Sequence, residues 1–216
     1  MWCCLTGPPQ YCHAQATDTT DVHEVARRVD ERYNHLTSLR ADFQELYQGA
    51  GMERMESGTL WLKRPGKMRW EYLDPHRKIF ISDGKRTFFY VFGESQARQV
   101  DVKSSEDLRS PLRYLLGKSK LEKEFEALRL ASGNGAQPGN VTLLGRPRAL
   151  GDRVDEVQLE INAASQIVRI VILQVDGSRT EFRFHGLNEN TPTADSLFRF
   201  SPPAGVQIIR SEDAVP

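Results

Sequence analysis

The stretch Leu60-Trp61-Leu62-Lys63-Arg64-Pro65 alternates apolar and other side chains in the pattern of a β-strand, and this pattern decides the predicted fold. A β-strand places successive side chains on opposite faces of a sheet. The two leucines are therefore expected on one face, with the tryptophan and the lysine on the other. Arg64 has the same parity as the leucines, so its guanidinium is expected at the end of an apolar stripe, just before the proline ends the strand.

The same two-residue alternation continues on both sides of this stretch. Asp83-Gly84 and Asp176-Gly177 each separate two apolar runs, which is a strong signal of a tight hairpin because such turns need residues that accept positive φ. The alternation predicts strands at residues 40–47, 58–63, 67–73, 77–82, 86–92, 96–102, 141–144, 155–162, 166–175, 179–187 and 197–200.

This pattern predicts about ten or eleven strands with short connections. Parallel strands need crossovers of about a dozen residues or more, so the sheet is expected to be antiparallel. A sheet of this size twists strongly, and it either closes into a barrel or stays open with its concave face covered. The predicted fold class is mainly β with a helical cover (α+β), as a single domain over residues 17–210.

Three segments are predicted as the helices of that cover. Residues 17–36 carry apolar side chains at three- and four-residue spacing, and Asp21 with Glu24 has the pattern of an N-terminal capping box. Residues 110–117 begin with Ser-Pro and end with Gly, the signals of a short helix, and residues 121–126 form a third candidate. Helices this short are not stable alone and must dock on the sheet.

Composition narrows the function further. The chain has 216 residues, 39% hydrophobic and 27% charged, which is typical of one globular domain. Lys+Arg and Asp+Glu are both 29, so no net charge attracts nucleic acid. No apolar run approaches the roughly 20 residues that span a bilayer.

The N-terminal segment 1–16 differs from the rest of the chain. It contains all three cysteines and ends in Ala14-Gln15-Ala16, the small-residue pattern of a secretory cleavage site. It lacks a basic start, so it is interpreted either as the remnant of a signal peptide or as a disordered N-terminus. Without it the chain has no cysteine and needs neither disulfides nor a thiolate metal site. Residues 211–216 are expected to form a C-terminal tail.

The sequence lacks the motifs of several enzyme classes. The five histidines are scattered, and none belongs to a cluster with metal-ligand spacing. There is no Gly-x-Ser-x-Gly elbow and no glycine-rich phosphate loop. Asp83 and Asp176 precede glycines and are interpreted as turn residues rather than catalytic acids. We therefore expect no catalytic residue, no metal and no cofactor.

Five segments occur in an order that one known family shares. They are Ala41-Asp42-Phe43-Gln44, GTLWLKRP at 58–65, MRWEY at 68–72, Ser82-Asp83-Gly84-Lys85, and FRFSPPAGV at 198–206. Their ordered set, over about residues 22–206, resembles the LolA family, the outer-membrane lipoprotein carrier proteins of the bacterial periplasm. The resemblance implies an unclosed antiparallel half-barrel, with the N-terminal helix and short inserted helices as a lid over a hydrophobic cavity.

The resemblance also implies a function. Such carriers accept a lipoprotein from an ABC-type releasing complex of the inner membrane, deliver it to an outer-membrane receptor, and change no covalent bond. Exposing an acyl chain to water costs about 0.8 kcal/mol per CH₂, so transfer between membranes needs a sheltering cavity. We expect a periplasmic monomer that binds lipoprotein acyl chains and no nucleic acid.

Large apolar side chains are the candidate lipid contacts. Ordinary core packing is the alternative for each of them, and periodicity does not separate the two. Methionine at position 68 stands where well-studied family members have an aromatic residue, although its flexible side chain suits a binding surface. The candidates are Leu60, Leu62, Met68, Trp70, Phe80, Phe88, Leu112, Leu115 and Leu116.

Arg64 is the candidate for a different role. In the family, the matching arginine bonds backbone carbonyls of the lid and of the first helix, and the corresponding acceptors here lie near Tyr33, Leu115 and Leu116. The resemblance thus implies a latch that holds the empty closed state and that acyl chains displace. The alternative is a surface arginine that ends a strand.

Two other functions stay open on the sequence. A relative with the same half-barrel would carry a glycolipid or sense mislocalised lipoproteins, although a sensor needs a further partner-binding domain. A lipid-ester hydrolase would need a nucleophile and a base that the sequence does not show.

Overall fold

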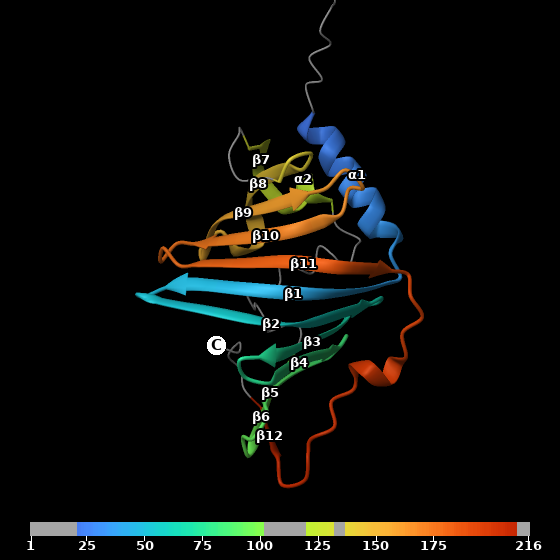
Figure 1. Ribbon diagram of the computed structural model, residues 1–216, viewed down its shortest axis with the longest axis vertical. Coiled ribbons are helices and arrows are strands. Elements are labelled where there is room, and N and C mark those ends of the chain that lie inside the picture. Colours follow the sequence, from blue (N-terminus) through green and yellow to red (C-terminus); the bar gives the residue numbers. More distant parts are fainter. Residues whose placement is uncertain (1–20, 102–119, 132–136, 211–216) are drawn as a thin grey trace, which may run out of the picture.

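The computed structural model describes residues 21–101, 120–131 and 137–210. In these residues a single sheet of twelve strands has the order β12-β6-β5-β4-β3-β2-β1-β11-β10-β9-β8-β7 (Figure 1). Its end strands do not pair with each other, so the sheet is open, and the prediction of an unclosed, mainly β fold is confirmed. The strands are β1 (Ser38–Gly49), β2 (Met52–Lys63), β3 (Lys67–Asp74), β4 (Lys78–Asp83), β5 (Arg86–Val91), β6 (Gln96–Asp101), β7 (Phe125–Leu130), β8 (Val141–Pro147), β9 (Val154–Ile161), β10 (Ile167–Gln174), β11 (Arg179–Glu189) and β12 (Gln207–Arg210).

Neighbouring strands of the described sheet are antiparallel except for β12, which runs parallel to β6. The sequence did not predict β12. The strand predicted at 197–200 is absent: Leu197 and Phe198 end the 3₁₀ helix η3 (Asp195–Phe198), and Arg199 and Phe200 follow it without regular secondary structure. Alternation misleads at this position, because the segment packs on the sheet through Phe198 rather than pairing with a strand. The helix predicted at 121–126 is only α2 (Leu121–Glu124), and the chain continues directly as β7.

Both predicted hairpin turns are present. Asp83 Oδ1 accepts hydrogen bonds from the backbone N–H groups of Lys85 and Arg86, each at 2.8 Å, and Asp176 Oδ1 accepts one from Ser178 at 2.9 Å. Only the glycines of the two turns, at φ +92° and +82°, take positive φ. The aspartates therefore act by holding the turn through their side chains, not by adopting the left-handed conformation.

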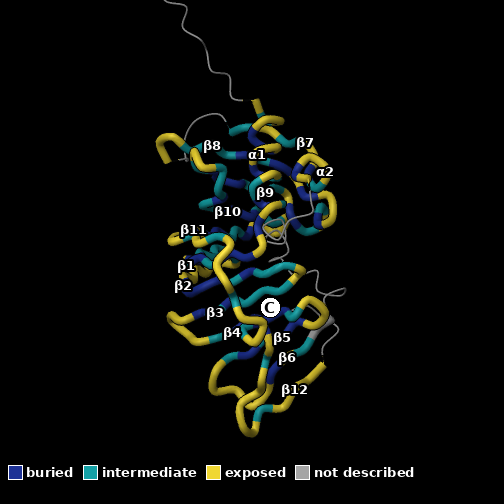
Figure 2. The backbone as a smooth tube through the Cα atoms, turned by 90° about the vertical axis from the view of Figure 1, so that its right-hand side faces the viewer, coloured by how far each residue is buried: buried dark blue, intermediate teal, exposed yellow. Residues whose placement is uncertain are grey.

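The long helix α1 (Val22–His35) begins where the capping signal placed it, because Asp21 accepts a hydrogen bond from the backbone N–H of His23 at 3.1 Å. Glu24 does not bond back to the cap and instead pairs with Arg27 at 2.8 Å. The buried stripe of α1 consists of Val25, Ala26, Val29 and Tyr33, which join the main apolar cluster of the sheet. Figures 1 and 2 show the helix along the β7–β11 half of the molecule.

The cap at Asp21 gives a first prediction. Replacing Asp21 with Ala removes the side-chain acceptor and leaves an N–H of the first turn unpaired, so we expect the free energy of unfolding to fall by about 1 kcal/mol. Urea unfolding followed by circular dichroism measures the change. Asp21→Asn keeps an acceptor oxygen and should unfold like the parent chain; equal losses in the two variants would contradict the capping role.

The two faces of the sheet differ in character. Residues directly opposite each other on neighbouring strands point to the same face. Leu60 lies opposite Trp70, and Trp70 opposite Phe80, on the face against which α1 packs, which we call the inner face. Trp61 and its cross-strand neighbour Arg69 lie on the opposite, outer face, as the parity of the strand predicted.

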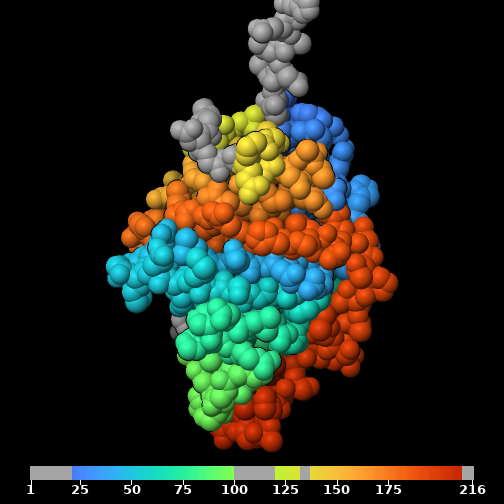
Figure 3. Space-filling model, in the orientation of Figure 1, coloured from blue at the N-terminus to red at the C-terminus, as the bar shows by residue number. Residues whose placement is uncertain are grey.

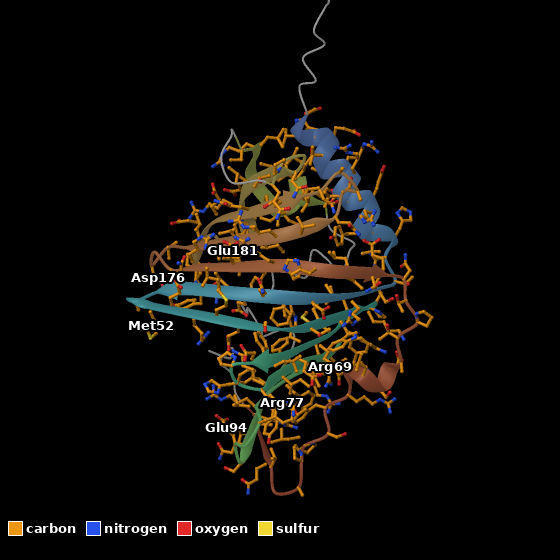
Figure 4. All side chains as sticks on the ribbon, in the orientation of Figure 1. Met52, Arg69, Arg77, Glu94, Asp176 and Glu181 are labelled. Carbon is orange, nitrogen blue, oxygen red and sulfur yellow. The ribbon has the colours of Figure 1, made fainter. Side chains whose placement is uncertain are left out.

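The outer face carries charge and a second, small apolar cluster. Glu181 is 3% exposed and accepts hydrogen bonds from three arginines, Arg169, Arg179 and Arg183, so these arginines outweigh the cost of burial and bring the pKa of Glu181 to about 2. Figure 4 labels Glu181 on β11. Toward β12, the outer face is covered by the C-terminal segment. The second cluster consists of Ile79, Ile81, Tyr90 and Ala97, with Phe200 and Val206 packed against it.

Candidate functional site

Four of the predicted lipid contacts come together in the centre of the inner face. Leu60 and Trp70 are fully buried at 0% exposure, and Leu62 and Phe80 are nearly so. Met68 packs against the same cluster from a partly buried position. The cross-strand register explains this grouping, since the side chains on facing strands β2, β3 and β4 meet on one face.

Phe88 does not join this group. It lies opposite Ile81 on β4 and therefore points to the outer face, where its ring stacks on Phe200 at 5.2 Å. The next residue, Phe89, lies opposite Phe80 and packs against the inner cluster. The run of aromatics at 88–90 conceals the parity of the strand, so the sequence alone did not separate the two faces. Leu112, Leu115 and Leu116 lie outside the described residues.

Other aromatic residues complete the inner face and were not predicted. Trp70 is the centre of the group: its ring lies 4.7 Å from that of Phe43 and 5.5 Å from that of Phe182, both in edge-to-face contact. Tyr72 contacts Phe43 at 4.9 Å. Once β1, β3 and β11 are known to be close, their register identifies these residues. The sequence could not identify them because β1 and β11, which pair in the sheet, are far apart along the chain.

Arg64 lies at one end of the inner face, just beyond β2. Its guanidinium donates hydrogen bonds to the carbonyl oxygens of Tyr33 at 2.5 Å and of Asn34 at 2.7 Å. Its Nε is buried and has no hydrogen-bond partner within the described residues. The last carbonyls of a helix lack intrahelical partners and carry its negative dipole end, so a cation there satisfies both requirements. The predicted acceptor Tyr33 is thus in contact with Arg64; Asn34 was not predicted.

Tyr33 also ties the helix to the sheet through its side chain. Its hydroxyl accepts a hydrogen bond from the backbone N–H of Ile167, the first residue of β10, at 2.9 Å. Burial is the main cause that raises the pKa of Tyr33 above its ordinary value. Beside it, Arg32 forms an ion pair with Glu189 of β11 at 2.7 Å. The C-terminal turn of α1 is therefore fixed to β10, β11 and Arg64.

A buried polar cluster closes the opposite end of the inner face. Glu45 and Glu56 face each other across β1 and β2 and are 7% and 3% exposed. The Tyr72 hydroxyl donates to Glu45 at 2.5 Å, and Lys78 pairs with Glu56 at 2.7 Å. The Lys78 ammonium also lies 4.3 Å from the centre of the Tyr72 ring. The apolar part of the inner face is thus bounded by the Glu45–Glu56 cluster within β1 and β2 and by Arg64 just beyond β2.

Helix α1 contacts α2 through two titratable side chains, His23 in its first turn and Asp30 in its second half. Asp30 accepts hydrogen bonds from the backbone N–H of Leu121 at 3.1 and 3.2 Å, and His23 pairs with Glu122 at 2.6 Å. Burial is the largest cause that raises the pKa of Asp30 to about 6, aided by Glu122 and opposed by the Leu121 hydrogen bond and by Lys120. Asp30 is therefore a carboxylate whose charge is poorly compensated in the fold.

This carboxylate gives a prediction on pH. A folded-state pKa above the unfolded value means that the folded chain binds more protons, so the contribution of Asp30 is present below about pH 4 and is lost as pH rises through about 6. Asp30→Asn keeps an acceptor for Leu121 but cannot ionise. We expect the melting temperature of Asp30→Asn to exceed that of the parent chain at pH 7.5 and to match it near pH 4. Scanning calorimetry at the two pH values measures this difference. The same difference at both pH values would contradict the argument.

Among the described residues, no group of three or more His, Cys, Asp or Glu side chains could hold a metal ion. The helices of the described part of the chain are all too short or too polar to cross a membrane. The arrangement is instead that of an open sheet with an aromatic-lined face and one helix held across it. This architecture defines the class of fold: an open antiparallel sheet whose apolar inner face is covered by one long helix.

Comparison with known proteins identifies the family. The chain belongs to the LolA family, because the model of that family, outer membrane lipoprotein carrier protein LolA, matches residues 34–201. It is 32% identical over 178 residues to an outer-membrane lipoprotein carrier protein of Nitrosospira multiformis, covering 80% of this chain and 82% of the relative. A protein of the same description from Dechloromonas aromatica is 24% identical over 210 residues, covering 95% of this chain and 93% of that protein.

A solved structure supports the fold independently of the sequence. The crystal structure of an uncharacterized conserved protein from Thermus thermophilus matches with a TM-score of 0.55 at 18% identity, covering 87% of this chain and 98% of that one. At this identity the likeness concerns the fold alone.

Proposed function

We propose that this protein is a periplasmic carrier that binds the acyl chains of lipoproteins released from the inner membrane and delivers them to a receptor on the outer membrane. The observation that carries the proposal is the inner face, where Leu60, Leu62 and Trp70 belong to one continuous buried apolar cluster between polar groups at both ends. Membership of a family described as lipoprotein carriers supports the same role.

The side chains of the inner face suit a ligand that is bound and released unchanged rather than a substrate that is chemically converted. Its centre holds aliphatic and aromatic side chains, and covering an acyl chain with such groups gains about 0.8 kcal/mol for each CH₂ removed from water. No bond-making group is needed for such binding, so we infer a chaperone without enzymatic activity. A protein with one such face can work as a monomer, with an ABC-type releasing complex and an outer-membrane receptor as successive partners.

Arg64 supplies a reason why the passenger would leave again. Its two hydrogen bonds hold the end of α1 against β2, and we infer that acyl chains between helix and sheet must break them. Each hydrogen bond to a charged donor contributes about 1.5–3 kcal/mol. The bound state is weakened by that amount, so the cargo is held reversibly. The hydrogen bonds to Tyr33 and Asn34 support the latch that the family resemblance implies.

Copurification tests the carrier function. The protein would be expressed with a tagged lipoprotein whose acylated cysteine is intact and, in parallel, with the same lipoprotein carrying Cys→Ser. We expect native mass spectrometry of the periplasmic carrier to find the acylated cargo bound in one copy and the unacylated cargo absent. Binding of both forms, or of neither, would contradict the proposal. Bound free glycolipid would instead support the glycolipid carrier, and turnover of a lipid ester would support a hydrolase.

A further inference from the structure

A cavity lies on the outer face, away from the proposed acyl-binding face. It has a volume of about 540 Å³ and is bordered by the β4–β5 turn, the start of β3 and the C-terminal segment around η3. Figure 3 shows the C-terminal segment, in red, beside the green strands in the lower part of the molecule. Ligand sites have volumes of about 300–1,000 Å³, so this cavity is large enough for a small polar molecule. We call it the basic pocket.

The charges of the basic pocket favour an anion. Four basic and two acidic side chains line it, an excess of two positive charges in a chain with no net charge. Both carboxylates are already occupied: Asp195 is held by Lys63 and Lys67 at 2.7 and 2.8 Å, and Asp83 by Arg86 at 3.1 Å. Hydrogen bonds from the two lysines are the largest cause that lowers the pKa of Asp195 to about 2, so it is ionised at neutral pH.

Two cations at the pocket are left for a ligand. Lys85 and Arg199 are exposed, and neither side chain has an ion pair or hydrogen bond with any described residue. They come from different parts of the chain, the β4–β5 turn and the segment after η3, and the fold brings them to one cavity. An ammonium and a guanidinium together suit the oxygens of a phosphate, since the guanidinium can donate two parallel hydrogen bonds.

Part of the remaining wall of the pocket is apolar, beside the polar side chains of Gln99 and Ser201. The stacked rings of Phe88 and Phe200 line it together with Ile208, which is 42% exposed. A bare inorganic anion would leave this wall uncovered. A phosphate that carries a small organic group would use both parts of the cavity, the cations for the phosphate and the rings for the carbon skeleton.

We propose that the basic pocket binds the phosphate-bearing headgroup of an anionic phospholipid, with Lys85 and Arg199 holding the phosphate and the Phe88–Phe200 pair lying against the glycerol. The site uses the outer face, so it does not compete with a passenger on the inner face. It rests on its own geometry and stands whether or not the inner face binds acyl chains.

The test uses headgroups without acyl chains, so that the inner face contributes nothing. Binding of glycerophosphoglycerol, the deacylated phosphatidylglycerol headgroup, to the full chain would be measured by NMR titration, beside inorganic phosphate and glycerophosphocholine. We expect glycerophosphoglycerol to bind at least tenfold more tightly than either. Lys85→Ala with Arg199→Ala should weaken its binding at least tenfold, and both positions are exposed, so the fold should be unaffected.

A matched control removes two exposed cations at the other end of the sheet, by Lys123→Ala with Arg148→Ala. This control should bind glycerophosphoglycerol as the parent chain does. Equal weakening in the two double variants would assign the binding to overall charge and overturn the proposal. Inorganic phosphate binding as tightly as glycerophosphoglycerol would overturn the headgroup assignment. Tighter binding of a tetra-aspartate peptide would make the pocket a protein-docking site instead, which also overturns it.

Discussion

Trp70→Ala is expected to lower the free energy of unfolding by about 3–5 kcal/mol, as replacing a buried tryptophan with alanine does in other cores. Trp70 is fully buried, and its ring contacts Phe43 and Phe182 in the centre of the inner face. Its indole N–H has no hydrogen-bond partner among the described residues, so the loss is one of packing alone. Chemical denaturation followed by circular dichroism measures it.

Two controls separate packing from residue type. Trp61→Ala removes the same side chain from a partly exposed position on the outer face, where the guanidinium carbon of Arg69 lies 5.9 Å from the centre of the Trp61 ring. Its loss in the free energy of unfolding should be less than half that of Trp70→Ala. Trp70→Phe keeps a ring and removes the unpaired N–H, so it should also be much milder than Trp70→Ala. A loss for Trp61→Ala as large as that for Trp70→Ala would show that the inner face is not the dominant core.

Arg64→Leu is the second change with a large expected effect. It leaves the carbonyls of Tyr33 and Asn34 without their donor, and each lost hydrogen bond to a charged group contributes about 1.5–3 kcal/mol. In the empty protein, the amides of the last turn of α1 should exchange hydrogen faster. If acyl chains displace this contact, the variant should bind a fluorescent acyl probe at least tenfold more tightly and release cargo to the receptor more slowly, since about 1.4 kcal/mol corresponds to tenfold in affinity.

The control for Arg64 is another arginine beside the same strands. Arg40→Leu removes a charge from β1 whose one ion-pair partner among residues 21–101, 120–131 and 137–210 is the half-exposed Asp42, at 3.0 Å. Probe affinity and helix exchange should therefore stay those of the parent chain. Faster exchange in Arg64→Leu with unchanged probe affinity would keep the structural contact and refute its role as a latch. Unchanged exchange would refute the contact itself.

Local signals predicted most of the fold. The alternation around Leu60, the cap at Asp21 and the two Asp-Gly turns each depend on neighbouring residues, and the structure has a strand, a helix start and two hairpins at those places. The alternation pattern gave a wrong prediction where apolar side chains pack onto the sheet without pairing as a strand. The alternation at 197–200 predicted a strand, but Leu197 and Phe198 end a 3₁₀ helix, and Phe198 is buried.

The sequence predicted the residues of the candidate site only where the alternation within a single strand determines which face a side chain occupies. Parity within β2 separated Leu60 and Leu62 from Trp61, and the register agrees. For Phe88 the aromatic run offered no parity, and only its pairing with Ile81 shows that it faces outward. Phe43 and Phe182 join Trp70 because β1 pairs with β11, a long-range contact that no local pattern encodes.

The parallel pairing of β12 with β6 has a consequence for the behaviour of the chain at high concentration. Without β12, the outer edge of strand β6 would have unpaired backbone N–H and C=O groups. A strand of a second copy of the chain could then pair with this edge. The four residues of β12 occupy that edge and end it in a strand too short to recruit a neighbour. The C-terminal strand therefore blocks the backbone groups of β6 from pairing with a second copy of the chain.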